Sequence, residues 1–173
     1  MNIKNYNRIM IVGSPGSGKS TFAEQLCKIT SLPLIHLDNE FWKPGWVETP
    51  RPEWIGKQKL LVSGDKWIID GDYSSTMEIR FEAAELIIFL DVNRFICIMR
   101  AAKRTGKKRM DLPDYLDEPK AISNDFFEFC KWIWDYPKKG RKKVLLLHNE
   151  YSEKAFLHIK YKRDVKKILR GET

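Results

Sequence analysis

The sequence predicts an α/β fold in which a parallel sheet is covered by helices on both faces. Short apolar runs alternate along the chain with longer segments of helical periodicity, which is the pattern of strand-helix-strand units. A glycine-rich segment joins the first apolar run to the first helical segment. The length of 173 residues suits one domain, and no repeat, linker or change of composition divides the chain. We therefore expect a single domain, 1–173.

The predicted strands are short apolar runs, and the first four are 8–12, 33–37, 66–70 and 85–90. Two runs compete for the fifth strand, 144–148 and 155–159. Periodicity does not separate a short strand from a piece of helix, so both stay open on the pattern alone. We favour 155–159, followed by a last helix that ends at Arg170.

Four longer segments have apolar residues at helical spacing: 19–30, 51–63, 93–104 and 122–136. Pro52 is acceptable in the first turn of the second segment, and Gly64 suits its end. Pro137 interrupts the last, aromatic segment. Strands and helices therefore alternate along the chain, as a parallel sheet requires.

The chain is basic, with 31 Lys and Arg against 23 Asp and Glu and a net charge of +8. The excess lies in three blocks, 94–109, 138–143 and 160–170. Nucleic acid, anionic membrane and phosphorylated metabolites are all compatible with such a charge. No apolar stretch reaches the roughly 18 residues of a membrane span, and residues 1–7 lack the apolar core of a secretion signal. We expect a cytoplasmic protein without a membrane partner.

The most specific motif is Gly-Ser-Pro-Gly-Ser-Gly-Lys-Ser at 13–20, which matches the pattern G-x-x-x-x-G-K-[ST] between a strand and a helix. Glycines allow the backbone N–H groups to surround a polyphosphate, and the helix adds its positive end. Lys19 would reach the β and γ phosphates of ATP, and the Ser20 hydroxyl would bind Mg²⁺. The expected ATP-binding residues of this loop are Gly13, Ser14, Gly16, Ser17, Gly18, Lys19, Ser20 and Thr21.

The sequence excludes other classes of nucleotide-binding protein. A GTPase would contain an Asn-Lys-x-Asp motif and an Asp-x-x-Gly motif after the second or third strand. This sequence contains neither motif at these places. A large motor ATPase is disfavoured by the length. What remains is a small domain that transfers the γ-phosphoryl group of Mg-ATP to a bound acceptor, and the sequence identifies neither this acceptor nor the oligomeric state.

Several segments together resemble the adenylate-kinase-like small P-loop kinases, and within them the DNA topology modulation (FlaR-like) proteins. The segments are the loop at 13–21, HLDNEFWKPGW at 36–46, WIIDGDY at 67–73, TMEIR at 76–80 and WIWDYPKK at 132–139. The resemblance implies a P-loop NTPase three-layer sandwich whose five parallel strands have the order 2-3-1-4-5. It also implies an acceptor-binding insertion at about 38–64 and a short lid at about 105–120.

The resemblance also suggests roles for three aspartates. Asp70, at the end of the third strand, is similar to an aspartate beside the magnesium ion in these kinases. Asp91 ends the fourth strand and is the second choice, because the glycine after Asp70 fits the kinase pattern better. Asp38 follows the second strand, where related kinases place a carboxylate that positions or deprotonates the acceptor. Turn formation and helix capping are the structural alternatives for these aspartates.

Several arginines and aromatic residues complete the predicted site. Arg51 and Arg80 are candidate acceptor clamps, because a guanidinium group can bind a phosphate or carboxylate with two hydrogen bonds. Arg100 and Arg104 resemble the R-x-x-x-R at the base of a kinase lid, and Arg109 would come from the lid itself. These three would bind ATP and the transferring phosphoryl group, unless they form a solvated basic face. The expected aromatic acceptor contacts are Trp42, Trp46 and Tyr73.

A second function stays open at this point: an ATP-binding regulator associated with DNA, in which the basic blocks bind the phosphate backbone. The acceptor residues Asp38, Arg51 and Arg80 would be unnecessary in such a protein. No helix-turn-helix, zinc-finger or RNA-binding signature is present. We therefore favour the kinase, with ATP, Mg²⁺ and a small, possibly nucleotide, acceptor as its ligands.

Overall fold

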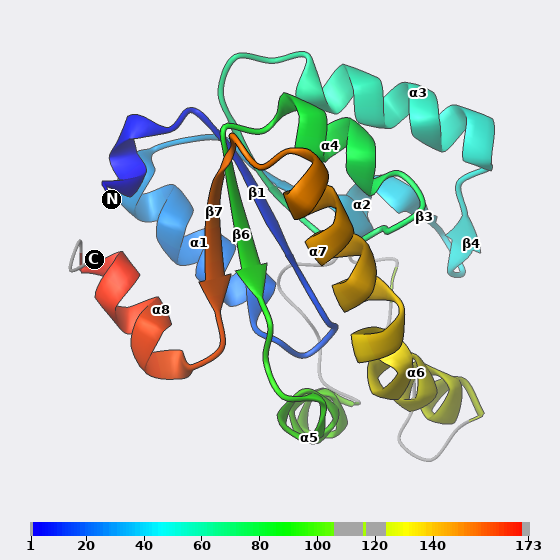
Figure 1. Cartoon of the computed structure of the whole chain (residues 1–173). Coiled ribbons are helices and arrows are strands. Elements are labelled where there is room, and N and C mark those ends of the chain that lie inside the picture. Colours follow the sequence, from blue (N-terminus) through cyan, green and yellow to red (C-terminus); the bar gives the residue numbers. More distant parts are fainter. Residues whose placement is uncertain (1, 106–115, 117–123, 171–173) are drawn as a thin grey trace.

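The computed structural model describes residues 2–105, 116 and 124–170, and its centre is a five-stranded parallel sheet (Figure 1). The order β2-β5-β1-β6-β7 is the predicted one, and every neighbouring pair is parallel. The prediction of 155–159 as the fifth strand is confirmed. The strands are β1 (Arg8–Gly13), β2 (Leu34–His36), β5 (Trp67–Asp70), β6 (Leu86–Leu90) and β7 (Ala155–Ile159).

The helices connect these strands, and a two-stranded antiparallel hairpin follows the second strand. The hairpin consists of β3 (Trp42–Lys43) and β4 (Val47–Glu48). The α-helices are α1 (Lys19–Thr30), α2 (Leu37–Phe41), α3 (Arg51–Val62), α4 (Met77–Ala83), α5 (Arg94–Arg104), α6 (Asn124–Asp135), α7 (Gly140–Glu150) and α8 (Lys162–Leu169). Two 3-10 helices, η1 (Ile3–Asn5) and η2 (Tyr136–Lys138), complete the described elements.

The alternative strand at 144–148 is wrong, because this segment lies inside α7. Val144 and Leu147 are buried three residues apart, whereas Leu146 is exposed. A helix places residues i and i+3 on one face, so α7 buries this apolar pair against the sheet and leaves Leu146 in solvent. The sequence pattern of a short apolar run did not distinguish these two outcomes.

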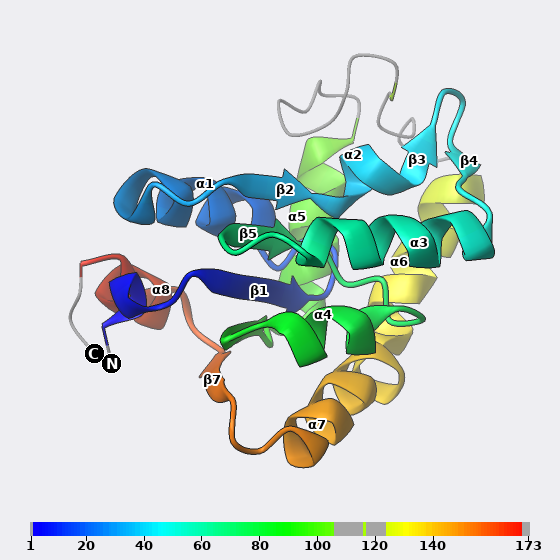
Figure 2. The same cartoon turned by 90° about the horizontal axis from the view of Figure 1, so that it is seen from above.

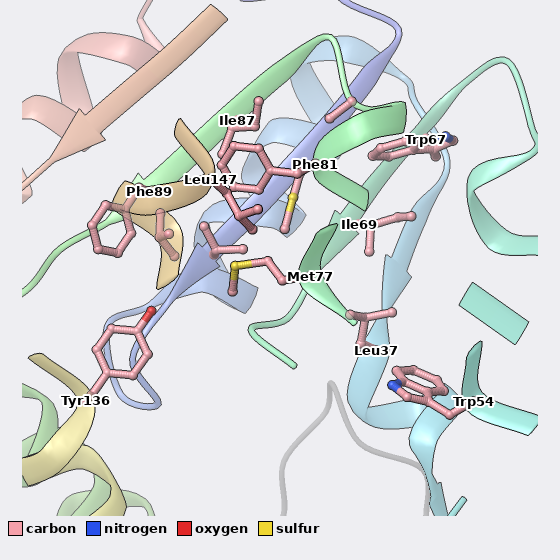
Figure 3. Close-up of a cluster of buried hydrophobic side chains, with 14 residues drawn as sticks. Leu37, Trp54, Trp67, Ile69, Met77, Phe81, Ile87, Phe89, Tyr136 and Leu147 are labelled. Carbon is pink, nitrogen blue, oxygen red and sulfur yellow. The ribbon is translucent and has the colours of Figure 1, made fainter. Parts of the chain in front are cut away.

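The three central strands β1, β5 and β6 are buried on both faces, and alternate side chains of β1 show how. Met10 and Val12 belong to a core cluster that also contains residues of α3, α4 and α7. Ile9 and Ile11 belong to the cluster on the other face, together with residues of α1 and α8. Figure 3 shows the first cluster, in which side chains from strands and helices meet. Burial on both faces explains why these strands read as continuous apolar runs.

Because the strands are parallel, all their carboxyl ends lie at one edge of the sheet. The loops that leave β1, β2 and β5 therefore start side by side. Figure 2 shows α2, the β3–β4 hairpin and α6 grouped at that end of the molecule. Ligands of open α/β sheets bind at this edge, so the fold selects it as the place to look for a site.

The predicted insertion at 38–64 corresponds to most of α2, the hairpin and α3. The predicted lid at 105–120 lies outside the described residues, apart from Thr105 and Leu116. The three cysteines are free thiols, and only Cys97 is buried. No helix within the described ranges combines the length and the apolar character that a bilayer crossing requires.

Gly16 provides a test of this packing. Its φ is +77°, and a Cβ atom there would overlap the carbonyl oxygen of Cys97 in α5. We expect Gly16→Ala to lower the free energy of unfolding by about 1–3 kcal/mol, since both the backbone conformation and the contact become unfavourable. Urea unfolding measures this change.

Gly56→Ala is the matched control for that experiment. Gly56 lies in α3, is exposed, and has no heavy atom within 4 Å of an added Cβ. Alanine should leave the free energy of unfolding unchanged or raise it by up to about 1 kcal/mol. Equal effects of the two substitutions would contradict the described path of the loop.

Candidate active site

The phosphate-binding loop connects β1 to α1. Helix α1 begins at Lys19, directly after Gly18, which has a left-handed φ of 97°. The Lys19 Nζ donates a hydrogen bond to the Ser14 carbonyl oxygen at 3.2 Å, so the lysine side chain folds back over the loop. The loop therefore brings an ammonium group and a helix N-terminus together, which is the arrangement that binds phosphate groups.

The predicted ATP-binding residues of this loop occupy two positions relative to the cleft. Gly13, Ser14 and Ser17 are buried and do not line the cleft. The cleft has a volume of about 1150 Å³ and lies at the carboxyl edge of the sheet. The members of the predicted set that line it are Gly16, Gly18, Lys19, Ser20 and Thr21.

Asp70 ends β5 and is hydrogen-bonded to a neighbour in the sheet. His36 of β2 is its register partner, and the His36 Nδ1 and Asp70 Oδ2 atoms are 3.0 Å apart. The other carboxylate oxygen, Oδ1, is buried and makes no hydrogen bond with any residue in the described part of the chain. A buried carboxylate oxygen without a partner is costly unless a ligand or water satisfies it.

This environment fits Mg²⁺. The ion prefers oxygen ligands and keeps several waters, so it is usually held by one or two protein groups together with substrate phosphates. Ser20 and Asp70 both line the cleft and supply oxygen atoms. Within the described ranges, no cluster of three His, Cys, Asp or Glu residues could hold a metal without such help. The residues present therefore suit an ion that arrives with a nucleotide.

Asp91, the second choice from the sequence, is engaged elsewhere. Its Oδ2 accepts a hydrogen bond from Arg141 Nε at 2.9 Å and lies 2.7 Å from His158 Nε2. It does not line the cleft. The geometry therefore supports Asp70 over Asp91 as the carboxylate for magnesium.

The buried Arg80 corrects one sequence expectation. Its side chain is fully buried, and its guanidinium donates to the carbonyl oxygens of Gly71 at 2.7 Å, Asp72 at 2.6 Å and Tyr73 at 3.2 Å. Burial lowers its pKa to about 10, so it stays charged at neutral pH. Arg80 is thus not an acceptor clamp. It fixes the loop that follows β5.

That loop carries Asp72, which sequence reasoning missed. Asp72 lines the cleft, accepts a 2.7 Å hydrogen bond from the Tyr136 hydroxyl, and is hydrogen-bonded to the Gly13 backbone. Burial raises the pKa of its carboxyl, although Tyr136 and the charges of Lys19 and Arg80 act in the opposite direction. The signal in the sequence was a second aspartate two residues after Asp70, because residues i and i+2 of an extended segment lie on the same face.

Asp38 and Tyr73 form a pair in the cleft. The Tyr73 hydroxyl donates to Asp38 Oδ1 at 2.7 Å, and the Trp42 side chain is hydrogen-bonded to Tyr73. Burial and the Asp38 carboxylate raise the pKa of Tyr73 far above its usual range, so the phenol remains protonated. The pair therefore holds one oxygen of a carboxylate in place at the cleft surface.

Aromatic rings surround this pair. Trp42, at the start of β3, and Trp46, in the hairpin turn, meet edge to face with ring centroids 5.3 Å apart. Phe41 contacts Trp42, Trp54 and Tyr73 at centroid distances of 4.9 Å, 5.0 Å and 4.9 Å. Phe41, Trp42, Trp46 and Tyr73 line the cleft, whereas Trp54 is buried in the core beneath them. Helix α6 contributes two more aromatic residues to the lining, Phe129 and Trp132.

The remaining predicted arginines have different positions. Arg51 is exposed at the start of α3 and does not line the cleft, so it is not placed as an acceptor clamp here. Arg100 donates to the carbonyl oxygens of Gly16 and Ser17, at 3.4 Å and 3.0 Å, and thereby supports the phosphate-binding loop. Arg104 lines the cleft. Arg109 lies outside the described residues.

Comparisons with known proteins agree with this architecture. No family model matches the chain, and no protein with a curated description matches its sequence. The chain is similar to the crystal structure of a gluconokinase from Sinorhizobium meliloti 1021, with a TM-score of 0.53 and 14% sequence identity. The similarity covers 96% of this chain and 89% of the gluconokinase chain. This chain has a P-loop NTPase fold. At so low an identity the comparison establishes the fold alone.

Asp70 and Asp91 can be separated by experiment. Asp70→Asn should raise the Mg²⁺ concentration needed for half-maximal ATP turnover by about 10-fold or more, the scale for losing a carboxylate beside a metal. Asp91→Asn should leave that concentration unchanged and lower the free energy of unfolding by about 1 kcal/mol, because it weakens the contacts to Arg141 and His158. A larger magnesium effect from Asp91→Asn would contradict the assignment.

Proposed function

We propose that the chain is a phosphotransferase that moves the γ-phosphoryl group of Mg-ATP to a nucleotide or another small molecule. One observation carries the proposal: the phosphate-binding loop and the Asp38–Tyr73 pair line the same cleft. A site for ATP and a site for an attacking hydroxyl group would then face each other. We also propose, from the motif resemblance, that the chain is related to the DNA topology modulation proteins. We further propose that it is located in the cytoplasm.

The proposed roles follow from chemistry and position. The loop amides and Lys19 would hold the β and γ phosphates, Ser20 would bind the magnesium ion, and Asp70 would lie beside it. Magnesium, when bound, would neutralise charge on the phosphate oxygens. Arg104 and, from the lid, Arg109 would stabilise the charge that spreads over the transferring group. Arg100 would act through the loop that it supports.

The transfer step uses the acceptor oxygen as the nucleophile. This oxygen forms a bond to the γ-phosphorus, while the bond between the γ-phosphorus and the bridging β–γ oxygen breaks and ADP leaves. The hydroxyl proton passes to the Asp38 carboxylate, which the Tyr73 hydroxyl orients. If the acceptor oxygen belongs to a phosphate group, no base is needed and Asp38 only positions the acceptor.

Lys19→Ala is the direct test of the proposal. The substitution should abolish ATP turnover and leave the folded structure intact, because Lys19 is hydrogen-bonded to a loop carbonyl oxygen and faces the cleft. Turnover is measured as ADP release across a panel of nucleosides, nucleotides and sugar acids. Lys28→Ala, on the same helix and away from the cleft, is the control and should behave as the unchanged chain. Normal turnover in folded Lys19→Ala would refute the proposal.

Arg104→Ala separates the kinase from the DNA-associated regulator. In a kinase the substitution should lower the phosphoryl-transfer rate by a factor of about 10³ or more. Lys103→Ala, its exposed neighbour outside the cleft, should change the rate little.

The same experiment includes a DNA arm. If the basic blocks bind DNA, Arg104→Ala and a combined Lys138→Ala and Lys139→Ala variant should each weaken binding to all sequences and reduce its salt dependence. We expect the loss of turnover and no such loss of DNA binding. Undiminished turnover together with lost DNA affinity would favour the regulator.

A further inference from the structure

The further inference rests on the proposed function and concerns the acceptor. We propose that the acceptor is a hydroxyl compound that has a flat ring system and lacks any phosphate or carboxylate group. An unphosphorylated nucleoside is an example of this class. The acceptor half of the cleft is defined here as the lining residues of α2, the β3–β4 hairpin and α6. Its charges and its aromatic surfaces both support this class.

Among the described residues, the arginines expected to clamp an anionic acceptor are not at the cleft surface. Arg80 is fully buried and its guanidinium is occupied by three backbone carbonyls, and Arg51 does not line the cleft. Of the described residues, the lysines and arginines that line the cleft are Lys19 and Arg104. Lys19 covers the phosphate-binding loop, and Arg104 follows Arg100 by one turn on the helix that supports that loop. Both are therefore placed for ATP.

Carboxylates occupy the acceptor half instead. It is lined by Asp38, Glu48, Asp125 and Glu128, although the whole chain has a net charge of +8. A phosphate dianion among these groups would be repelled, whereas a neutral hydroxyl compound or an ammonium group would not. Segment 106–123, which apart from Leu116 lies outside the described residues, has no net charge in the sequence: its cations are Lys107, Lys108, Arg109 and Lys120, and its acids are Asp111, Asp114, Asp117 and Glu118.

The aromatic surfaces fit a flat ring. Trp46 is 37% exposed and Trp132 is 50% exposed, and both line the acceptor half. Phe41, Trp42 and Phe129 line it as well. Stacking of a base on an aromatic side chain contributes about 1–3 kcal/mol, and it tolerates different bases because each has a flat face. Asp38 could then accept the proton of a hydroxyl group attached to such a ring system.

The test compares matched compounds that differ only in an anionic group. With Mg-ATP present, kcat/KM is measured for adenosine, guanosine, cytidine and uridine and for their 5′-monophosphates, with gluconate as a carboxylate acceptor. We expect at least one nucleoside to be phosphorylated with a kcat/KM about 10-fold or more above its monophosphate, which is a difference of about 1.4 kcal/mol. An equal or higher kcat/KM for a monophosphate or for gluconate would overturn the inference.

A charge change inside the acceptor half sharpens the comparison. Glu48→Lys should shift the ratio of kcat/KM toward the monophosphates, because it replaces a repelling charge by an attracting one. Glu78→Lys makes the same charge change at an exposed position of α4, away from the cleft, and should leave the ratio unchanged. Equal shifts in the two variants would mean that overall charge decides the preference, and would overturn the inference.

Failure of the inference and failure of the proposed function give different results. Calorimetry of ATP with the unchanged chain and with Lys19→Ala tests the phosphate site alone, and equal affinities would refute the proposed function. A third outcome is that ATP binding depends on Lys19 while no compound is phosphorylated. In that case, quenching of tryptophan fluorescence by nucleosides and by their monophosphates tests the inference about the acceptor. Stronger quenching by nucleosides than by their monophosphates supports the inference, and equal, weaker or absent quenching up to millimolar concentration overturns it.

Discussion

The site depends on one buried charge. The guanidinium of Arg80 lies inside the protein and donates hydrogen bonds to three successive residues of the loop after β5, Gly71, Asp72 and Tyr73. A buried charge is costly unless polar partners surround it, so this loop has one favourable path. That path places Asp72 against the phosphate-binding loop and Tyr73 against Asp38. The loops after β1, β2 and β5 are thereby joined around one cleft.

The phosphate-binding loop and the acceptor half supply different groups to the cleft, although Asp72 adds a carboxylate beside the loop as well. At the loop, Lys19, the loop backbone and the N-terminus of α1 favour phosphate groups. In the acceptor half, carboxylates and aromatic rings from α2, the hairpin and α6 favour an uncharged or cationic ring compound. The basic blocks that give the chain its net charge fall mainly on α5, α7 and α8. The positive net charge of the chain therefore does not indicate that the side chains lining the acceptor half are mainly acidic.

The features that local patterns determine were predictable from the sequence. The glycine-rich loop, β1 and α1 were found, because their spacing reflects interactions within a few residues. The strand β7 was the favoured one of two runs that the local pattern left open. The strand order was implied by the resemblance and is confirmed. Arg80 and Asp72 were not predictable in this way, since their roles depend on burial and on contacts such as that with Tyr136, 64 residues from Asp72. The alternative strand at 144–148 failed because its packing partners, not its composition, make it helical.

The central claim is that one cleft holds ATP at the phosphate-binding loop and the acceptor at the Asp38–Tyr73 pair. A crystal structure with a non-hydrolysable ATP analogue, Mg²⁺ and a nucleoside tests it most directly. The account predicts the β and γ phosphates within hydrogen-bond distance of Lys19 and the loop amides, with the γ-phosphate facing a nucleoside hydroxyl beside Asp38. Density for the analogue away from residues 13–20, or a nucleoside bound outside the cleft, would contradict the account.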